Sequence, residues 1–379
     1  MYRKPMRIAL LGFGTVGGGV YEFLQERKDM QLCYVLSRRP RPEVKCTVTD
    51  DFSVIVNDPE VDVVIEAIGG MHPAYAYVKA ALQAGKHVIT ANKLLIAAHY
   101  RELVELAAKK GVALRCSAAV GGGIPWLANL ERTLEQEPIL RISGIMNGTT
   151  NYILDSMHSH DMDFNAALLE AQHLGYAEAD PMADLNGGDI RRKLVISANI
   201  AFGCVLQEEE IAVFGMERLR TEDIRACKKM GRVCKMIASA RNLDGRVAAY
   251  IEPAFVPSEM HEAAVPQNFN LISLTGQHIG KQSFYGQGAG RYPTAYNVLQ
   301  DCVDVRNGLV GFYTDRLQDR RVDNSAVVRS YYVRTDRIDK WLQAHVEKIL
   351  DGAVLTKPVS VTEIHAWAKE RDCFIASIR

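Results

Sequence analysis

The chain has 379 residues, enough for two domains and a small third. Hydrophobic residues make up 48% of it and charged residues 24%, and the formal net charge is zero, which is the balance of an ordinary globular protein. This composition gives no sign of a nucleic-acid partner, and no apolar run reaches the roughly 18 residues of a membrane span.

The cysteines and the first residues of the chain indicate in which cellular compartment the protein is expected. The eight cysteines form no C-x-x-C pair, so we expect reduced thiols that mostly fill the core. The first residues, MYRKPMRIALLGFG, lead directly into a predicted strand, so we expect no targeting peptide. We therefore expect a cytoplasmic protein.

Strands and helices alternate along the first third of the chain. Short apolar runs typical of buried strands occupy residues 7–11, 32–37, 61–69 and 87–91. Helical spacing follows the first run in VYEFLQER and precedes the fourth in AYAYVKAALQAG, where Gly85 stands at a C-cap position. The alternation predicts an α/β fold, with a parallel sheet covered by helices on both faces.

A glycine-rich loop lies between the first strand and the first helix. Gly12, Gly14 and Gly17 form a G-x-G-x-x-G motif, in which the first glycine permits the tight turn and the second lets a pyrophosphate approach the backbone. The residues between the glycines are Phe13, Thr15 and Val16. The setting predicts a Rossmann-type dinucleotide-binding domain over residues 1–128, although a glycine turn that only packs a helix is the alternative.

The end of the second strand bears on which dinucleotide binds. NAD sites usually place a carboxylate about 20 residues after the glycine loop, where it bonds the ribose hydroxyls. Here the strand ends in Ser37, Arg38 and Arg39. A guanidinium suits a 2′-phosphate, so we favour NADP over NAD. The alternative is that both arginines are solvated loop charges.

The pattern changes after about residue 128. A strand over 139–147, the helical segments FNAALLEAQHLG and IRRKLVISANIAFG, and shorter strands with glycine turns over 249–290 predict a second, α+β domain at 129–285. A helix follows in PTAYNVLQDCVDV, and residues 286–310 are expected to complete the first domain.

The tail at 330–379 has an order of its own. We predict a strand in SYYVRT, a helix in DKWLQAHVEKIL, a strand in AVLTKPV, a helix in TEIHAWAKER and a strand in CFIASIR. The charged segment RLQDRRVDNSA before it is expected to be a linker. These elements predict a small βαβαβ module of about fifty residues, close to the lower limit for independent folding.

Five further segments resemble one family in order and spacing. They are TANK (Thr90–Lys93), VGGGIP (Val120–Pro125), NGTTNY (Asn147–Tyr152), GYAEADPMADLNGGDIRRK (Gly175–Lys193) and GQGAGRYPT (Gly286–Thr294). With the glycine loop they resemble homoserine dehydrogenase over about residues 7–305, and the fourth segment is the most specific. The resemblance implies NAD(P)-dependent interconversion of L-homoserine and L-aspartate 4-semialdehyde, in threonine and methionine biosynthesis. It also implies a homodimer formed through the second domain.

Asp189 and Lys193 carry the expected chemistry. They are four residues apart on a predicted helix and so share one face, and Asp184 is a plausible cap of that helix. A lysine ammonium can stabilise the negative oxygen that hydride transfer creates and can supply its proton. The resemblance implies that Lys193 and Asp189 are the catalytic pair, with Asp189 orienting the lysine. Taken alone, the spacing would indicate a surface salt bridge worth about 0.3–0.5 kcal/mol.

The resemblance implies further binding residues. On the substrate side these are Glu178, Lys93, Gly148, Thr149, Tyr176 and Asp184. On the cofactor side they are Thr90, Asn92, Lys93 and Gly288. Lys93 is also the second candidate for the catalytic lysine, because it follows a parallel strand at the end where α/β sheets bind ligands. The structural alternatives are a plain Asn-Gly turn at Gly148 and a tight turn before a helix at Gly288.

Two features depart from the family pattern. The resemblance implies a monovalent cation (Na⁺ or K⁺) held by the backbone carbonyls of Val120, Gly122 and Ile124 and by a glutamate, but Ser117 stands at the glutamate position. Loss of that carboxylate weakens the case for the ion. Many relatives also carry a βαββαβ amino-acid-sensing domain of the ACT type, and this tail is expected to be a shortened form lacking one strand.

Two other functions fit part of the pattern. One is a dehydrogenase of another small amino or hydroxy acid, and the other is a non-catalytic sensor that binds nucleotide. The combination of Glu178, Asp189 and Lys193 argues against a sensor, because binding alone does not require the lysine. An aspartate semialdehyde dehydrogenase is disfavoured, since no cysteine is placed as a nucleophile beside a base.

Overall fold

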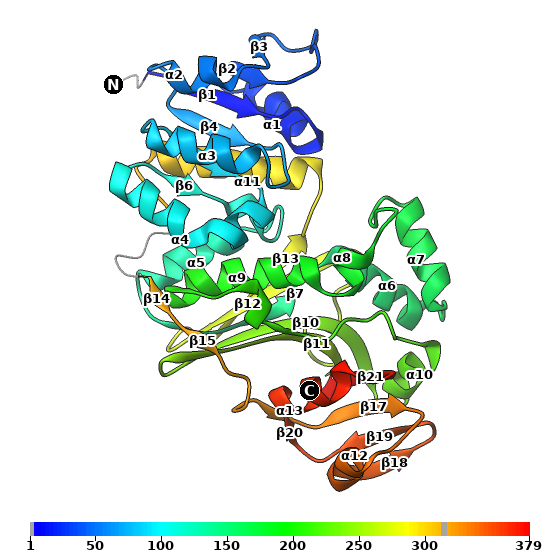
Figure 1. Cartoon of the computed structure of the whole chain (residues 1–379). Coiled ribbons are helices and arrows are strands. Elements are labelled where there is room, and N and C mark those ends of the chain that lie inside the picture. The colour runs from blue at the N-terminus through cyan, green and yellow to red at the C-terminus, as the bar shows by residue number, and fades with distance from the viewer. Residues whose placement is uncertain (1–3, 312–316) are drawn as a thin grey trace. The chain divides into compact units, whose positions relative to one another are not determined.

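The computed structural model describes residues 4–311 and 317–379, and the chain divides into two compact units (Figure 1). The first unit comprises Met1–Arg132 and Gln287–Gln318, and the second comprises Thr133–Gly286 and Asp319–Arg379. The tail therefore belongs to the second unit and does not form a third.

The first unit contains a six-stranded sheet in the order β3-β2-β1-β4-β5-β6, with every neighbouring pair parallel. The strands are β1 (Met6–Leu11), β2 (Met30–Leu36), β3 (Thr47–Thr49), β4 (Val63–Glu66), β5 (His87–Thr90) and β6 (Leu114–Arg115). The order reverses at β1, which is the switch point at which doubly wound sheets bind dinucleotides. The predicted fold class is confirmed.

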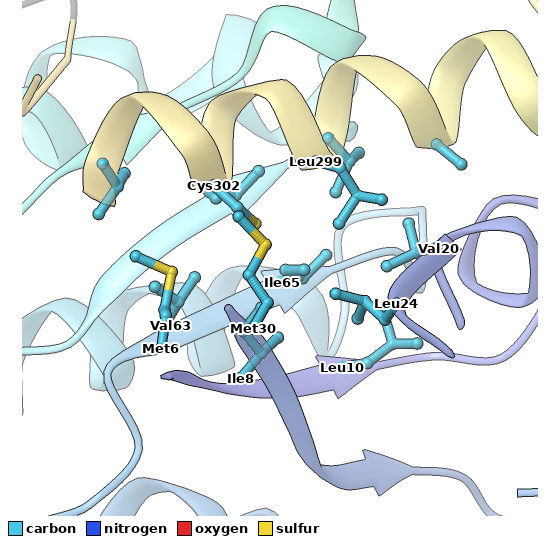
Figure 2. Packing of buried hydrophobic residues seen from close by; sticks show 14 of the residues in the cluster. Met6, Ile8, Leu10, Val20, Leu24, Met30, Val63, Ile65, Leu299 and Cys302 are labelled. Atoms are coloured by element: carbon cyan, nitrogen blue, oxygen red, sulfur yellow. The ribbon is translucent and has the colours of Figure 1, made fainter. Parts of the chain in front are cut away.

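Helices from two distant parts of the chain cover this sheet. They are α1 (Thr15–Gln25), α2 (Phe52–Asn57), α3 (Ala74–Gln83), α4 (Lys93–Lys110) and α11 (Arg291–Arg306). Figure 2 shows Leu299 and Cys302 of α11 in the cluster formed by β1, β4 and α1, which includes Ile8, Ile65 and Leu24. Burying these apolar groups, at roughly 25 cal/mol per Å² of apolar surface, is what fixes α11 to the first unit.

The main sheet of the second unit follows the order β13-β12-β7-β10-β11-β21-β17-β19-β18, and β9 and β15 also pair with β11. Its strands before the tail are β7 (Ile139–Ile145), β9 (Ala212–Val213), β10 (Arg232–Leu243), β11 (Arg246–Pro257), β12 (Phe269–Gly276), β13 (Lys281–Gln287) and β15 (Arg321–Val322). The β10–β11 hairpin turns at Asp244-Gly245, where Gly245 has a φ of 71°. An Asp-Gly pair is favoured there because such hairpin turns need positive φ.

Six helices follow β6 in chain order before α11. They are α5 (Trp126–Leu134), which contains the division between the units, α6 (Gly148–Ser159), α7 (Phe164–His173), α8 (Met182–Leu185), α9 (Gly188–Phe202) and α10 (Thr221–Lys229). The shorter elements are η1 (Ser117–Ala119), β8 (Cys204–Val205), η2 (Glu208–Glu210), β14 (Gln318–Asp319), β16 (Val328–Arg329) and β20 (Val359–Ser360). Helix α9 is buried along most of its length and contacts β7, β10 and β11, and its buried residues include Asp189 and Lys193 beside the apolar side chains. None of the helices described is long and apolar enough to cross a membrane.

The tail adds one strand more to the main sheet than the sequence predicts. Besides the short β20, which pairs with β16, its elements are β17 (Tyr331–Thr335), α12 (Lys340–His345), β18 (Val346–Leu350), β19 (Ala353–Thr356), α13 (Val361–Lys369) and β21 (Cys373–Ile378). The segment expected as one helix breaks at His345, because VEKIL pairs with β19 across a turn at Asp351-Gly352, where Gly352 has a φ of 72°. The layout is thus a full βαββαβ, and the expectation of a shortened module is wrong.

The tail continues the sheet of the second unit. Strand β21 pairs in parallel with β11 through Ala254 and Phe255, and antiparallel with β17. Beneath this junction Glu252 of β11 is fully buried, and its Oε2 lies 3.0 Å from the Tyr331 hydroxyl and 2.9 Å from Nε2 of His365. Burial alone would raise the pKa of Glu252, but the hydrogen bond and charge of His365 outweigh it and hold the pKa below its usual range.

This junction predicts a large loss of stability in His365→Ala. The substitution leaves the Glu252 carboxylate buried without its main partner, so we expect the free energy of unfolding to fall by about 3 kcal/mol. The matched control is His278→Ala, because Nδ1 of His278 also lies 2.9 Å from a glutamate oxygen, that of Glu137, but the histidine side chain is 79% exposed. The control should cost less than about 1 kcal/mol in denaturant titrations. Equal losses would contradict the account of the junction.

Candidate active site

The glycine loop presents an open backbone at the end of β1. Gly12 has a φ of 95°, and a Cβ there would lie 2.8 Å from the Ala67 carbonyl oxygen, while a Cβ on Gly17 would lie 2.3 Å from the Gly12 oxygen. A Cβ on Gly14 would meet nothing within 4 Å. Thr15 and Val16 lie in the first turn of α1, whose N-cap is Gly14. The loop is therefore packed tightly at its two ends and open at Gly14, as a bound pyrophosphate requires.

A cavity of about 900 Å³ adjoins this loop. Its lining includes Gly12, Phe13 and Gly14 from the loop, Ser37, Arg38, Arg39 and Arg41 after β2, and Asp50. The Arg41 guanidinium stacks over the Phe13 ring, 5.1 Å from its centroid. Sequence reasoning missed Arg41 and Asp50, although the run Arg-Arg-Pro-Arg could have suggested Arg41. The residues present fit a dinucleotide, since an open glycine turn adjoins a cavity lined by three arginines.

The ends of β4 and β5 are joined by a buried carboxylate. Glu66 is fully buried, and its Oε2 accepts a 2.5 Å hydrogen bond from the Thr90 hydroxyl while its Oε1 accepts from the amides of Ile68 and Gly69. Asn92 caps α4 by accepting from the Leu95 amide at 3.1 Å, and Lys93 is the first residue of that helix. Sequence reasoning missed Glu66, although a single acid in an apolar strand end was the available signal.

Lys193 and Asp189 form a buried ion pair on α9. Nζ of Lys193 lies 2.7 Å from Oδ2 of Asp189 and also donates to the Met146 carbonyl oxygen at 2.7 Å. The two side chains are 8% and 9% exposed, which excludes the surface salt bridge that spacing alone suggested. The predicted common face of the two residues is confirmed.

Asn147 connects this pair to a second carboxylate. Its side-chain amide donates to Asp184 at 2.7 Å and to Asp189 at 2.9 Å, and its Oδ1 caps α6 by accepting from the Thr150 amide. Asp184 lies within α8, and α9 begins only at Gly188 behind a left-handed Gly187, so the expectation that Asp184 caps that helix is wrong. Burial, and then the charge of Asp189, raise the pKa of Asp184. Asn147 is a site residue that the sequence analysis did not single out.

The remaining predicted substrate residues lie around the start of α6 and the loop after α7. A Cβ on Gly148 would lie 2.6 Å from the Asn268 carbonyl oxygen, which by itself explains a glycine there. The Thr149 hydroxyl donates to the Tyr176 carbonyl at 2.6 Å, and the Tyr176 ring stands edge-on to Tyr152. Glu178 is exposed two residues further along this loop. Thr149 therefore ties α6 to the segment that carries Glu178.

A second buried lysine lies on β10. Nζ of Lys235 donates to Oδ1 of Asn151 at 2.9 Å and to the Val265 carbonyl at 2.6 Å. Burial lowers the pKa of Lys235 to about 8. No sequence signal marked this residue, because a lysine in a strand is ordinarily exposed.

The predicted cation ligands are placed in the first unit. The carbonyls of Gly122 and Ile124 both accept hydrogen bonds from the Asn297 side chain. Gly288 packs against the same loop, because a Cβ on Gly122 would lie 2.7 Å from the Gly288 oxygen. Within residues 4–311 and 317–379, no group of three or more His, Cys, Asp or Glu residues is arranged to hold a metal ion.

These features together define a class of protein. A sheet with the order 3-2-1-4-5-6, an open glycine loop at its switch point and an arginine-lined cavity are those of a dinucleotide-binding enzyme. The second unit adds a buried Lys-Asp ion pair, and acid–base reactions of a nicotinamide-dependent oxidoreductase use ionisable groups of this kind.

Comparison with known proteins identifies the family. The family model described as "Homoserine dehydrogenase, NAD binding domain" matches residues 12–117, and that described as "Homoserine dehydrogenase" matches residues 125–303. The homoserine dehydrogenase of Pseudomonas aeruginosa is 36% identical, covering 89% of this chain and 83% of its own length. That of Bacillus subtilis is 37% identical, covering 81% and 74%. The crystal structure of a homoserine dehydrogenase from Thiobacillus denitrificans superposes with a TM-score of 0.90 at 30% identity, covering 99% and 98%.

The chain therefore belongs to the homoserine dehydrogenase family. It is an oxidoreductase that interconverts L-homoserine and L-aspartate 4-semialdehyde with a nicotinamide dinucleotide, as the sequence analysis predicted.

The raised pKa of Asp184 predicts a pH-dependent effect of Asp184→Asn. A carboxyl whose pKa rises on folding favours the folded state while it is protonated, and that contribution is lost as pH rises through the folded pKa. The asparagine removes this loss and can still accept from Asn147. The difference between the melting temperature of the variant and that of the wild type should therefore be more positive at about pH 8 than at about pH 4. A difference that stays constant or reverses would show that ionised Asp184 does not strain the site.

Proposed function

We propose that Lys193 is the acid–base residue of homoserine oxidation and that Asp189 is the residue that positions it. The observation that carries this proposal is the buried ion pair on α9. Burying two charges is costly unless each is paired and hydrogen-bonded, and a pair retained at that cost is a candidate for function. Lys193 is held from two sides, by Asp189 and by the Met146 carbonyl.

The proposed roles follow from this geometry. The dinucleotide supplies the hydride donor or acceptor when it is bound. During reduction of the semialdehyde, the Lys193 ammonium stabilises the developing negative charge on the oxygen and gives it a proton. During oxidation of homoserine, the same nitrogen in its neutral form takes the hydroxyl proton. Asp189 and Met146 fix the direction of Nζ, and Asn147 fixes Asp189.

The other residues of the second unit are proposed to bind the substrate. The carboxylates of Asp184 and Glu178 suit an α-ammonium group, which all forms of the substrate carry. Gly148, Thr149 and Tyr176 are proposed to shape the same site through the start of α6 and the loop that Thr149 holds. On the cofactor side we propose Thr90, Asn92, Lys93 and Gly288, all of them in the first unit.

We further propose that NADP is the preferred dinucleotide. Three arginines, Arg38, Arg39 and Arg41, line the cavity beside the glycine loop, and Asp50 is the one acidic residue among the described residues that line it. A 2′-phosphate can accept paired, charge-assisted hydrogen bonds from such a group of arginines. A homodimer formed through the second unit remains a proposal that follows from the family resemblance, and a cytoplasmic location remains a proposal that rests on the cysteines, which form no C-x-x-C pair. Sedimentation of the purified protein tests the dimer.

Lys193→Ala should lower kcat by about 10²-fold or more, because it removes a general acid–base group. The matched control is Lys235→Met, which removes the other buried lysine of the second unit and should leave kcat within about tenfold of wild type. Both variants are compared by steady-state oxidation of L-homoserine, with circular dichroism as the check of folding. Near-normal kcat in Lys193→Ala, or the larger loss in Lys235→Met, would remove Lys193 from the proposed role.

Arg38→Ala should raise the KM for NADP by about tenfold or more, as loss of a charge-assisted hydrogen bond to a phosphate does. The KM for NAD should change much less, since NAD has no 2′-phosphate. Lys45→Ala is the control, because it removes the same charge from the same connecting segment at an exposed position outside the cavity lining. Equal effects of Arg38→Ala on both dinucleotides would contradict the 2′-phosphate proposal.

A further inference from the structure

The loop at Val120–Ile124 is where the family resemblance implies a monovalent cation. We propose that in this chain the side-chain amide of Asn297 takes the place of that cation, so that the enzyme needs neither Na⁺ nor K⁺. The loop, the asparagine and their neighbours all belong to the first unit.

Asn297 satisfies two of the three carbonyls that the family resemblance assigns to the cation, those of Gly122 and Ile124. Its Nδ2 lies 2.5 Å from the Gly122 oxygen and 3.0 Å from the Ile124 oxygen, and the residue is 1% exposed. An amide nitrogen carries two hydrogens, so each carbonyl can receive one. Those hydrogens carry partial positive charge and lie where the carbonyl oxygens converge. These amide hydrogens would repel a cation bound to the same two oxygens, so the residues present do not fit the ion.

Ser117, which stands where the family pattern has a glutamate, bonds to another part of the first unit. Ser117 donates to Asp301 through its amide at 2.9 Å and through its hydroxyl at 2.7 Å. The Asp301 carboxylate is in turn paired with Arg115, whose Nε lies 3.0 Å away. The Arg115 guanidinium therefore neutralises the Asp301 carboxylate, so this carboxylate does not replace the glutamate as a ligand of a metal ion.

Helix α11 holds both ends of the segment by one face. Asn297 and Asp301 are four residues apart on that helix and so point in the same direction. Asp301 holds the segment at Ser117, and Asn297 holds it at Gly122 and Ile124. Two side chains of one helix thus hold a segment that the family pattern would fasten with an ion.

The Val120–Ile124 loop has to be held in one position because it packs closely against the turn at 287–290. Gly122 has a φ of 54°, and a Cβ there would lie 2.7 Å from the Gly288 oxygen. The Gly123 amide donates to the Gln287 carbonyl at 3.2 Å. Asn297 is accordingly a positioning residue, since it fixes the loop against the turn at 287–290 that the proposed function assigns to the cofactor side.

The first test uses the wild-type enzyme. The kcat and KM for L-homoserine and the melting temperature are measured in NaCl, KCl and tetramethylammonium chloride at equal ionic strength, because the organic cation is too large for a carbonyl site. We expect kcat and KM in the three salts to agree within about twofold and the melting temperatures to agree within about 1 °C. If the enzyme binds no Na⁺ or K⁺, replacing these ions by the organic cation removes no bound ligand. A loss of activity or a lower melting temperature in tetramethylammonium alone would overturn the proposal.

The second test restores the site. The double variant Asn297→Ala, Ser117→Glu removes the amide and supplies a carboxylate, so Na⁺ or K⁺ should now raise its melting temperature by about 2–4 °C over the value in tetramethylammonium. The control Asn324→Ala removes another buried amide that donates to a carbonyl, that of Ala249, and should lose stability without gaining a cation response. A folded double variant that ignores both ions, or a control that responds as strongly, would overturn the proposal. If the double variant does not fold, the wild-type comparison decides by itself.

Discussion

Two opposite charges buried one helical turn apart on α9 set the requirements for the second unit. Lys193 and Asp189 lose most of their contact with water, which costs several kcal/mol per ion unless the protein replaces the lost hydrogen bonds. The replacements come from the Met146 carbonyl and the Asn147 amide, which lie where β7 ends and α6 begins. The pair therefore also fixes the junction of β7 and α6 against α9, and a change at that junction acts directly on the lysine.

The same junction explains why charges of like sign can be gathered there. Asp184 and Asp189 share the amide of Asn147, and the pKa of Asp184 is raised first by its burial and then by the charge of Asp189. The elements around these groups are α9, which is buried along most of its length, and the β10–β11 hairpin, which α9 contacts. The tail adds to this support by extending the sheet beyond β11 and covering Glu252.

Local patterns in the sequence predicted the parts of the site that local physics determines. The i,i+4 spacing placed Asp189 and Lys193 on one face, and the strand–glycine–helix pattern located the dinucleotide loop. Contacts between distant segments were not predictable in this way. Asn147 meets Asp184 and Asp189 across about forty residues, and Asn297 meets Gly122 across more than 170. Strand β18 was missed because a five-residue strand directly after a short helix continues the helical pattern, and only its partner β19 distinguishes the two.

The most direct test of this account compares the two lysines that sequence and structure offer for the chemistry. Single-turnover oxidation of L-homoserine with saturating dinucleotide is measured in Lys193→Ala and Lys93→Ala, with binding of the dinucleotide measured on the same samples. The account predicts that the chemical step slows by about 10²-fold or more in Lys193→Ala and by less than about tenfold in Lys93→Ala. The reverse ranking, in folded variants that still bind the dinucleotide, would move the catalytic centre to Lys93 and contradict the account.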